Sequence, residues 1–147
     1  MKKTTPVSDI MSRYIVTVTP NTSVLEVKSL FDKNQFHHLP VVDNEKLMGI
    51  ISKIDVYQVT HCDALFRSKP DQEFNDRLLK SVLAEEIMGK HLVVLSPTDT
   101  VTEAAALFSK NKYHALPVVD NGKFVGIVTT YDLLEYADHD VSLPDLM

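Results

Sequence analysis

The feature that most constrains this chain is an internal repeat with a period of 77 residues. When residues 10–57 are laid over residues 87–134 without a gap, 21 of the 48 positions are identical. Typical amino-acid usage would give about three identities by chance over that length. The longest shared stretch, Leu-Pro-Val-Val-Asp-Asn, occupies residues 39–44 and recurs at 116–121. The sequence therefore predicts two copies of one structural unit.

Both copies predict the same order of elements. A β-branched or apolar run that ends before a proline predicts a first strand, at 15–18 and at 92–95. A Ser/Thr-x-x-Glu capping box then opens a helix after Ser23 and after Thr100. The remaining elements are two strands in each copy (39–43 and 47–51; 116–120 and 124–128) and a second helix that begins at Ser52 or Thr129. The pattern indicates an α/β protein made of two βαββα units.

The repeat also sets the expected domain organisation. We expect a first motif over 7–60, a connecting helical linker over 61–82, a second motif over 83–138 and a C-terminal tail over 139–147. The linker helix is predicted to begin near residues 70–71 and has an apolar face. A unit of about fifty residues buries too little core by itself. We therefore expect the two motifs to pack as a pseudo-twofold pair.

Composition and charge exclude several classes of partner. The net charge is −5 and the chain has no basic run, which argues against a nucleic-acid or anionic-membrane surface. No apolar segment approaches the ~20 residues needed to span a bilayer, and the N-terminus lacks the apolar region of a signal peptide. The single cysteine, Cys62, fits a reducing compartment. We expect a cytoplasmic protein.

Two Gly-to-Asp segments are the strongest candidates for a ligand site. They occupy residues 49–55 and 126–132. Each runs from a strand into a helix, so that Ser52 or Thr129 lies at a helix N-cap, where backbone N–H groups favour an anion. Three positions later, Asp55 or Asp132 supplies a carboxylate that can accept from both hydroxyls of a ribose. These residues suit a phosphorylated ribose, although a capping box alone would also explain them.

Histidines precede the Leu-Pro pair in both copies: His37, His38 and His114. Imidazole can donate to a phosphate and gain charge on doing so, and Lys53 follows the first N-cap. A histidine at a strand end is often simply a partly buried polar residue, and that interpretation stays open for each of the three. Phe36 and Tyr113 precede the histidines, where they could wall an aromatic base or pack into the core.

In combination, these motifs resemble a tandem pair of cystathionine β-synthase (CBS) domains, also called a Bateman module. The resemblance covers residues 7 to about 136 and includes Asp-Ile-Met at 9–11 and Glu-Ile-Met at 86–88. It implies a regulatory module without catalytic activity that binds adenosine-containing ligands (AMP, ADP, ATP or S-adenosylmethionine) between its motifs. It also implies a homodimer, no cofactor beyond the regulatory adenine nucleotide, and a separate regulated protein.

The resemblance assigns roles to particular positions. It places the ribose at Asp55 and Asp132, phosphate or ribose at Ser52 and Thr129, phosphates at His37, His38 and His114, and the base near Thr17 and Val94. The second copy departs from this pattern, because Ala115 stands at the second basic position and Thr130 stands in place of Lys53. We therefore expect the first copy to supply most of the phosphate contacts.

Three other interpretations differ in how well the sequence supports them. An enzyme is disfavoured because no nucleophile with a base and no paired acid and base can be assembled from the sequence. A metal site is disfavoured because the clusters at 61–63 and 138–140 lack the paired spacing of a structural zinc site. A ligand-free dimerisation or protein-interaction module remains the alternative, since a degenerate pair could keep its assembly and lose its ligand.

Overall fold

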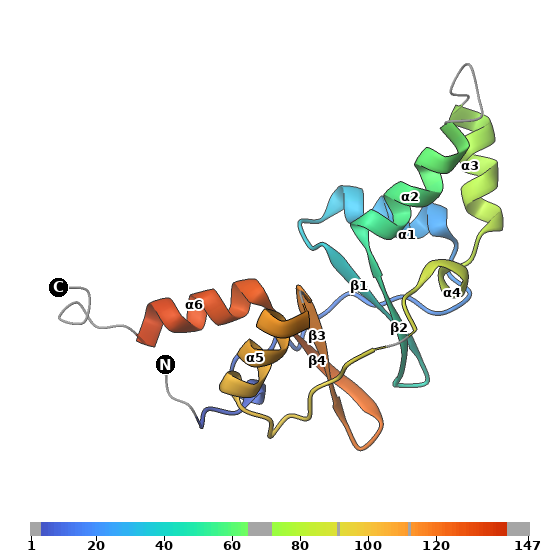
Figure 1. The fold of residues 1–147 in the computed structure, drawn as a ribbon. Coiled ribbons are helices and arrows are strands. Elements are labelled where there is room, and N and C mark those ends of the chain that lie inside the picture. Colours follow the sequence, from blue (N-terminus) through green and yellow to red (C-terminus); the bar gives the residue numbers. More distant parts are fainter. Residues whose placement is uncertain (1–3, 65–71, 91, 112, 141–147) are drawn as a thin grey trace. The chain divides into compact units, whose positions relative to one another are not determined.

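The computed structural model describes residues 4–64, 72–90, 92–111 and 113–140 (Figure 1). The elements of the first repeat and the connection are α1 (Val24–Lys33), β1 (His38–Asp43), β2 (Lys46–Ser52), α2 (Lys53–Ala64), α3 (Gln72–Ser81) and α4 (Ala84–Ile87). Those of the second repeat are α5 (Val101–Asn111), β3 (Ala115–Asp120), β4 (Lys123–Thr129) and α6 (Thr130–Asp140), and a 3-10 turn, η1 (Val7–Asp9), lies near the N-terminus. The α/β class is confirmed, with two small antiparallel sheets.

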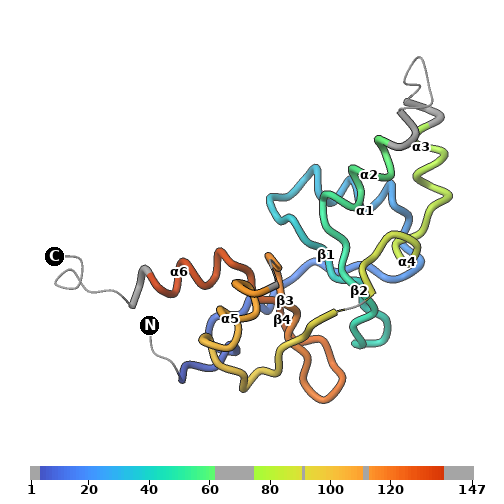
Figure 2. The backbone as a smooth tube through the Cα atoms, in the orientation of Figure 1, coloured from blue at the N-terminus to red at the C-terminus, as the bar shows by residue number. Residues whose placement is uncertain are grey.

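The chain forms two compact units whose limits differ from those of the repeats. One unit is continuous, Val16–Leu92, and the other combines Met1–Ile15 with Val93–Met147. We call them the continuous unit and the composite unit. In the tube drawing, the segment near the N-terminus runs beside the chain that leads into α5 (Figure 2).

Each unit is completed by a segment that precedes the other repeat. We call residues 5–12 and 82–89 the exchanged segments. In the composite unit, Val7 N–H donates to the carbonyl of Asp99 (2.7 Å). The equivalent bond in the continuous unit runs from Ala84 N–H to Thr22 O, also at 2.7 Å. The two exchanged segments thus dock in the same way, one on each unit.

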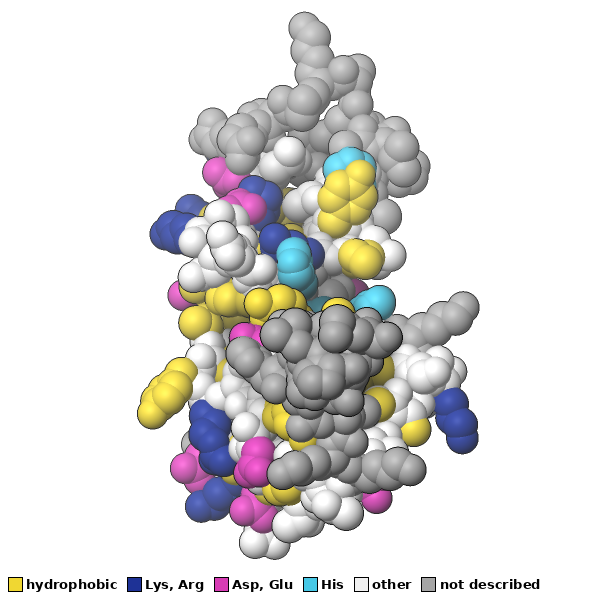
Figure 3. Space-filling view, turned by 90° about the vertical axis from the view of Figure 1, so that its left-hand side faces the viewer, with side chains coloured by type: hydrophobic (Ala, Val, Ile, Leu, Met, Phe, Trp, Pro, Cys, Tyr) yellow, Lys and Arg dark blue, Asp and Glu magenta, His cyan; other side chains and the backbone are white. Residues whose placement is uncertain are grey.

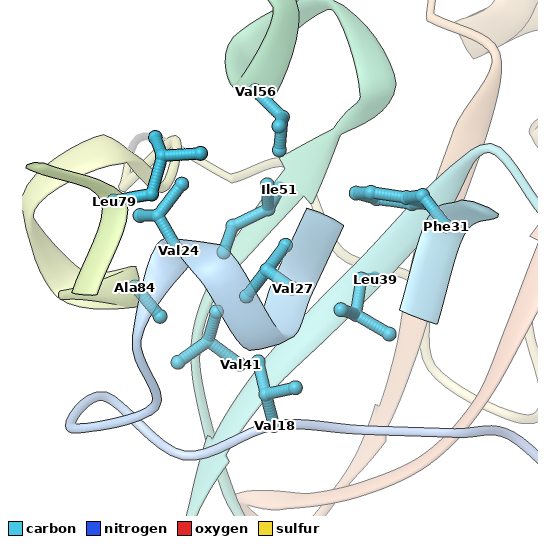
Figure 4. Packing of buried hydrophobic residues seen from close by; sticks show 10 residues of the cluster. All are labelled: Val18, Val24, Val27, Phe31, Leu39, Val41, Ile51, Val56, Leu79 and Ala84. Carbon is cyan, nitrogen blue, oxygen red and sulfur yellow. The ribbon is translucent and has the colours of Figure 1, made fainter. Parts of the chain in front are cut away.

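The core of the continuous unit lies between α1 and the β1–β2 hairpin (Figure 4). Val24 and Val27 on α1 and Leu39, Val41 and Ile51 on the strands are fully buried. This burial follows from the helical spacing of the valines and from the alternation along β1, which place the apolar side chains on facing surfaces. The composite unit repeats the arrangement with Leu116, Val118 and Val128, and adds Val7 and Met11 from its exchanged segment.

The predicted first strands are wrong as strands, because each is reduced to one parallel bridge. Val18 N–H donates to Pro40 O, and Val18 O accepts from Val42 N–H (3.0 and 2.8 Å). Extending this parallel ladder by two residues toward the N-terminus would need an N–H on Pro40, and extending it toward the C-terminus would need one on Pro20. Proline has no N–H to donate. Leu95 makes the same bridge to Val118, and Pro117 and Pro97 prevent its extension in the same way.

The other predicted elements are confirmed, with small shifts of their ends. The hairpin turns are tight, and Asn44 and Glu45 have φ of 49° and 68°, as a type I′ turn requires. The capping box of α5 is complete, since Thr100 N–H donates to Glu103 Oε2 (3.0 Å) and Glu103 N–H donates to Thr100 Oγ1 (3.1 Å). The connecting helix is α3, and its predicted start at residues 70–71 lies outside the described residues.

Candidate functional site

The strand-to-helix corner of the continuous unit joins the end of β2 to the start of α2. Ser52 N–H donates to Asp55 Oδ2 (2.8 Å), and Asp55 N–H donates to Ser52 Oγ (3.2 Å). The N–H of Lys53 donates to the carbonyl of His37 (3.1 Å), which fixes the histidine backbone against the first turn of the helix. His38 is paired with Ser52 across the hairpin. The structure therefore brings all five of these predicted site residues together.

The corner of the composite unit has the same geometry. Thr129 N–H donates to Asp132 Oδ2 (2.8 Å), and Asp132 N–H donates to Thr129 Oγ1 (3.2 Å). The N–H of Thr130 donates to His114 O (3.2 Å). The matching distances differ by no more than 0.1 Å between the units, so the two corners differ in side-chain chemistry and not in backbone form.

These hydrogen bonds show that both aspartates close a reciprocal capping box. The N–H groups of Lys53 and Asp55, at the start of α2, already have partners within the chain. An anion at this helix end would therefore find fewer donors than a free N-terminus offers. The carboxylates keep acceptor capacity, because Oδ1 of Asp55 and Oδ1 of Asp132 accept no hydrogen bond from the described residues. The corner can thus serve as a cap and still accept from hydroxyl donors on the Oδ1 side.

Exposure separates the predicted residues into two groups. His37, Lys53 and His114 are exposed, so their polar groups can meet a solute. Ser52, Asp55 and their counterparts Thr129 and Asp132 are half-buried. The basic side chains at the corners are therefore more accessible to a solute than the carboxylates.

The two predicted aromatic walls pack into the cores. Phe36 is half-buried and its ring meets that of Phe31 edge-on, with the centroids 5.8 Å apart. Tyr113 packs against the core of the composite unit. Core packing, the second interpretation of these residues, accounts for both. Thr17 and Val94, predicted to lie near a base, are exposed beside the bridging residues Val18 and Leu95.

The glycine in the middle of each second strand leaves room for an exchanged segment. A Cβ on Gly49 would lie 2.6 Å from Met88 Sδ and 2.7 Å from the carbonyl oxygen of Gly89. A Cβ on Gly126 would lie 2.7 Å from Met11 Sδ. The atoms that approach these glycines belong to the exchanged segments.

A side-chain contact that the sequence did not reveal ties the N-terminus to the last helix. Thr5 Oγ1 and Tyr136 Oη lie 2.7 Å apart. In the continuous unit the equivalent positions are Val82 and Val59, which pack against its core. The repeat alignment contains a signal for this contact, because the second unit has Thr5 and Tyr136 at the two positions where the first has valines.

The described residues show no cluster of metal ligands, and the face drawn in Figure 3 carries charges of both signs. No group of three His, Cys, Asp or Glu side chains within the described residues could hold a metal ion. On the face drawn in Figure 3, basic and acidic side chains lie among one another. A hollow of about 390 Å³ lies on α1 and involves none of the predicted site residues. Its lining is Leu25, Lys28, Ser29, Asp32 and Lys33.

Comparison with known proteins decides the family. The sequence model of the CBS domain matches residues 7–61 and 84–139, one match for each repeat. The chain belongs to the CBS domain family. This match confirms the resemblance that the repeated motifs indicated. CBS pairs are typically regulatory modules.

Three similar proteins place this CBS pair among its relatives. Protein MJ1225 of Methanocaldococcus jannaschii is 32% identical over 131 residues, and its crystal structure matches with a TM-score of 0.80. That match covers 93% of this chain and 49% of the MJ1225 chain, so this CBS pair spans about half of that protein's length.

The other two relatives were crystallised with adenosine compounds. CBSX2 in complex with AMP is 26% identical, with a TM-score of 0.75, and the match covers 92% of this chain and 97% of that one. The CBS pair of protein MJ0100, in complex with 5′-methylthioadenosine and S-adenosyl-L-methionine, is 30% identical with a TM-score of 0.71. That match covers 93% of this chain and 98% of the other.

Within the described residues, none of the helices combines the length and the apolar character needed to cross a bilayer. The longest of them, α2, has 12 residues, whereas a span needs about 20.

Proposed function

We propose that this CBS pair binds an adenosine-containing nucleotide (AMP, ADP or ATP) at its strand-to-helix corners, without catalysis, and regulates a separate protein. We also propose a homodimer as the assembly that does so. The relatives crystallised with AMP and with S-adenosylmethionine support an adenosine ligand. The exposed histidines and Lys53 favour a ligand with phosphates, because a phosphate gains charge-assisted hydrogen bonds from them.

The observation that carries the proposal is the half-used carboxylate in both corners. A carboxylate offers about four acceptor sites on two oxygens, and the capping box takes up Oδ2 of Asp55 and of Asp132. Capping fixes the side chain, so a ribose diol would meet an acceptor that is already ordered. Such preorganisation lowers the entropy cost of binding.

The test must separate capping from ligand binding. Asp55→Glu and Asp132→Glu keep a capping residue of the kind that α5 uses at Glu103, but move the carboxylate by one methylene. We expect each variant to change the free energy of unfolding by less than about 0.5 kcal/mol. A nucleotide at a hundredfold excess over Kd should stabilise the wild-type protein by about 2.7 kcal/mol and so raise its melting temperature. The double variant should lose this thermal shift.

The matched control is Glu103→Asp, the reciprocal exchange in a capping box that lies away from the corners. It should leave the nucleotide shift unchanged. A shift that survives in the double Asp→Glu variant would remove the aspartates from the site.

The alternative function is that of a ligand-free interaction module, and one observation favours it: capping alone explains the conserved spacing within both repeats. Wild-type protein that shows no thermal shift with AMP, ADP, ATP or S-adenosylmethionine would support this alternative and overturn the proposed nucleotide binding.

A further inference from the structure

Each exchanged segment packs the thioether of a methionine directly on a strand glycine. In the continuous unit, Met88 Sδ and Cγ lie 2.6 and 2.7 Å from the place that a Cβ on Gly49 would occupy. In the composite unit, Met11 Sδ and Cγ lie 2.7 and 3.0 Å from the corresponding place on Gly126. Each sulfur is therefore in close contact with a strand backbone, and an atom added to it on the glycine side would collide with that backbone.

The two methionines differ in how far water-borne reagents can reach them. Met11 is 8% exposed and belongs to the core cluster of the composite unit. Met88 is half-buried and packs at the margin of the core of the continuous unit. A small reagent dissolved in water can therefore reach Met88 more readily than Met11.

Met88 also lies next to the residue that joins its exchanged segment to the sheet. Gly89 N–H donates to Ile50 O (2.8 Å), and Ile50 N–H donates to Gly89 O (3.2 Å). This bridge is isolated and does not belong to a longer ladder. The neighbouring side-chain contact therefore has a large share in holding this end of the segment on the strand.

We propose that Met88 is a site of reversible oxidation to methionine sulfoxide, and that its oxidation releases residues 82–89 from the sheet of the continuous unit. The oxidant is a hydroperoxide. A lone pair of Sδ attacks one peroxide oxygen, the S–O bond forms as the O–O bond breaks, and the sulfur loses two electrons. The other oxygen leaves with the proton, as water from hydrogen peroxide or as an alcohol from an alkyl hydroperoxide.

The sulfoxide cannot keep the packing of the thioether. An oxygen on the side of Gly49 would overlap the strand backbone. An oxygen on the other lone pair turns an apolar group at the core margin into a strong hydrogen-bond acceptor that favours water. Either product weakens the docked state, and the composite unit stays closed for as long as Met11 is reduced. This inference goes beyond the proposed nucleotide binding and does not depend on it.

The experiment treats the full chain with increasing concentrations of hydrogen peroxide. Peptide mass spectrometry locates the sulfoxide, and amide hydrogen exchange measured by NMR reports the docking. Met88 should be oxidised before Met11. In protein that carries the Met88 sulfoxide, the amides of Ala84 and Gly89 should exchange about tenfold faster or more, because they donate to the continuous unit only while the segment is docked.

The composite unit supplies the internal control. Val7 and Ser12 are the repeat counterparts of Ala84 and Gly89, and their amides donate to Asp99 O and to Ile127 O. These two amides should keep their exchange rates while Met11 stays reduced. Treatment with methionine sulfoxide reductase should return the exchange of Ala84 and Gly89 to its original rate.

Two variants assign the effect to one sulfur. Met88→Leu keeps a side chain of similar volume without sulfur, so its segment should dock and peroxide should leave its amide exchange unchanged. Met48→Leu is the matched control: Met48 is also half-buried against this core but lies on β2. This variant should respond to peroxide as the wild type does.

Three results would overturn the proposal. The first is slow exchange of Ala84 and Gly89 in wild-type protein that carries the Met88 sulfoxide, a result that requires no variant to fold. The second is a Met88→Leu protein whose segment is released by peroxide as in the wild type. The third is oxidation of Met11 ahead of Met88.

Discussion

The continuous unit and the composite unit have the same hydrogen-bonded frame but different chemistry at a few matching positions. The bonds that dock the exchanged segments and close the corners recur with nearly equal lengths. Within this common frame, the repeat alignment places Glu45 at the position of Gly122, Lys53 at that of Thr130, and Val82 at that of Thr5. A duplicated frame thus lets one unit act as the control for the other, since a residue from one repeat can be placed in the same backbone setting of the other.

The largest expected effect comes from disrupting a contact that both units share, the packing of a methionine against a strand glycine. Gly49→Ala places a Cβ within 2.7 Å of both Met88 Sδ and a backbone oxygen. The backbone oxygen cannot move as a side chain can, so we expect the variant to lose about 2 kcal/mol or more of stability, as overpacked cores do. Chemical denaturation measures this loss.

Gly89→Ala is the matched control, since the nearest atom to its Cβ lies 3.6 Å away. It should be close to neutral. Equal stability of the Gly49→Ala and Gly89→Ala variants would show that Met88 does not pack against Gly49.

The next effect sharpens the difference between the corners. Lys53→Thr gives the continuous unit the residue of the composite unit, and should weaken nucleotide binding by about tenfold through loss of a charge-assisted hydrogen bond to phosphate. Titration calorimetry with ATP checks this. Lys46→Thr, at the far end of β2, serves as the control, and an affinity unaffected by Lys53→Thr would contradict the expected asymmetry.

A smaller effect concerns the hairpin turns. Gly122 has a φ of +84°, so Gly122→Glu, which copies the residue of the first repeat, should cost about 1 kcal/mol in the left-handed region. Gly122→Asn should cost less, because asparagine tolerates that region better. Thermal unfolding ranks the three proteins, and the idea fails if glutamate and asparagine are equivalent.

The smallest effect concerns the contact between the N-terminus and α6. Thr5→Val and Tyr136→Phe each remove one partner of the 2.7 Å contact, and should cost up to about 1 kcal/mol. The double variant should cost less than the sum of the two, because it leaves no unpaired hydroxyl and approaches the Val–Val pair of the other unit. A double-mutant cycle measures the coupling, and strict additivity would show that the hydroxyls do not interact.

The sequence predicted the elements whose signals are local. Alternation along residues 39–43, the turn at Asn44 and the capping boxes at Thr100, Ser52 and Thr129 each depend on neighbours a few residues apart. The helices and hairpins were therefore found nearly at their true ends. The corner residues were also assembled correctly, because a strand that runs directly into a helix fixes them within one turn.

The missed features depend on residues far apart in the chain. The prediction of the first strands was wrong because their partner strand has a proline at the position where the ladder would continue. That register is not visible in either segment alone. The docking of residues 5–12 on the second repeat was missed because periodicity within a segment carries no information about which sheet it meets. The packing of Gly49 against Met88 was not predicted for the same reason, since Met88 lies 39 positions away.

The exchanged segments have a practical consequence for dividing this protein into fragments. A fragment cut at the repeat, residues 7–60, would lack the exchanged segment that packs on its own sheet, residues 82–89. It would also carry most of the exchanged segment 5–12 without the unit on which that segment docks. The continuous stretch from Val16 to Leu92 holds everything that its body needs. The composite unit could be made from one polypeptide by joining residues 1–15 and 93–147 through a linker, in either order.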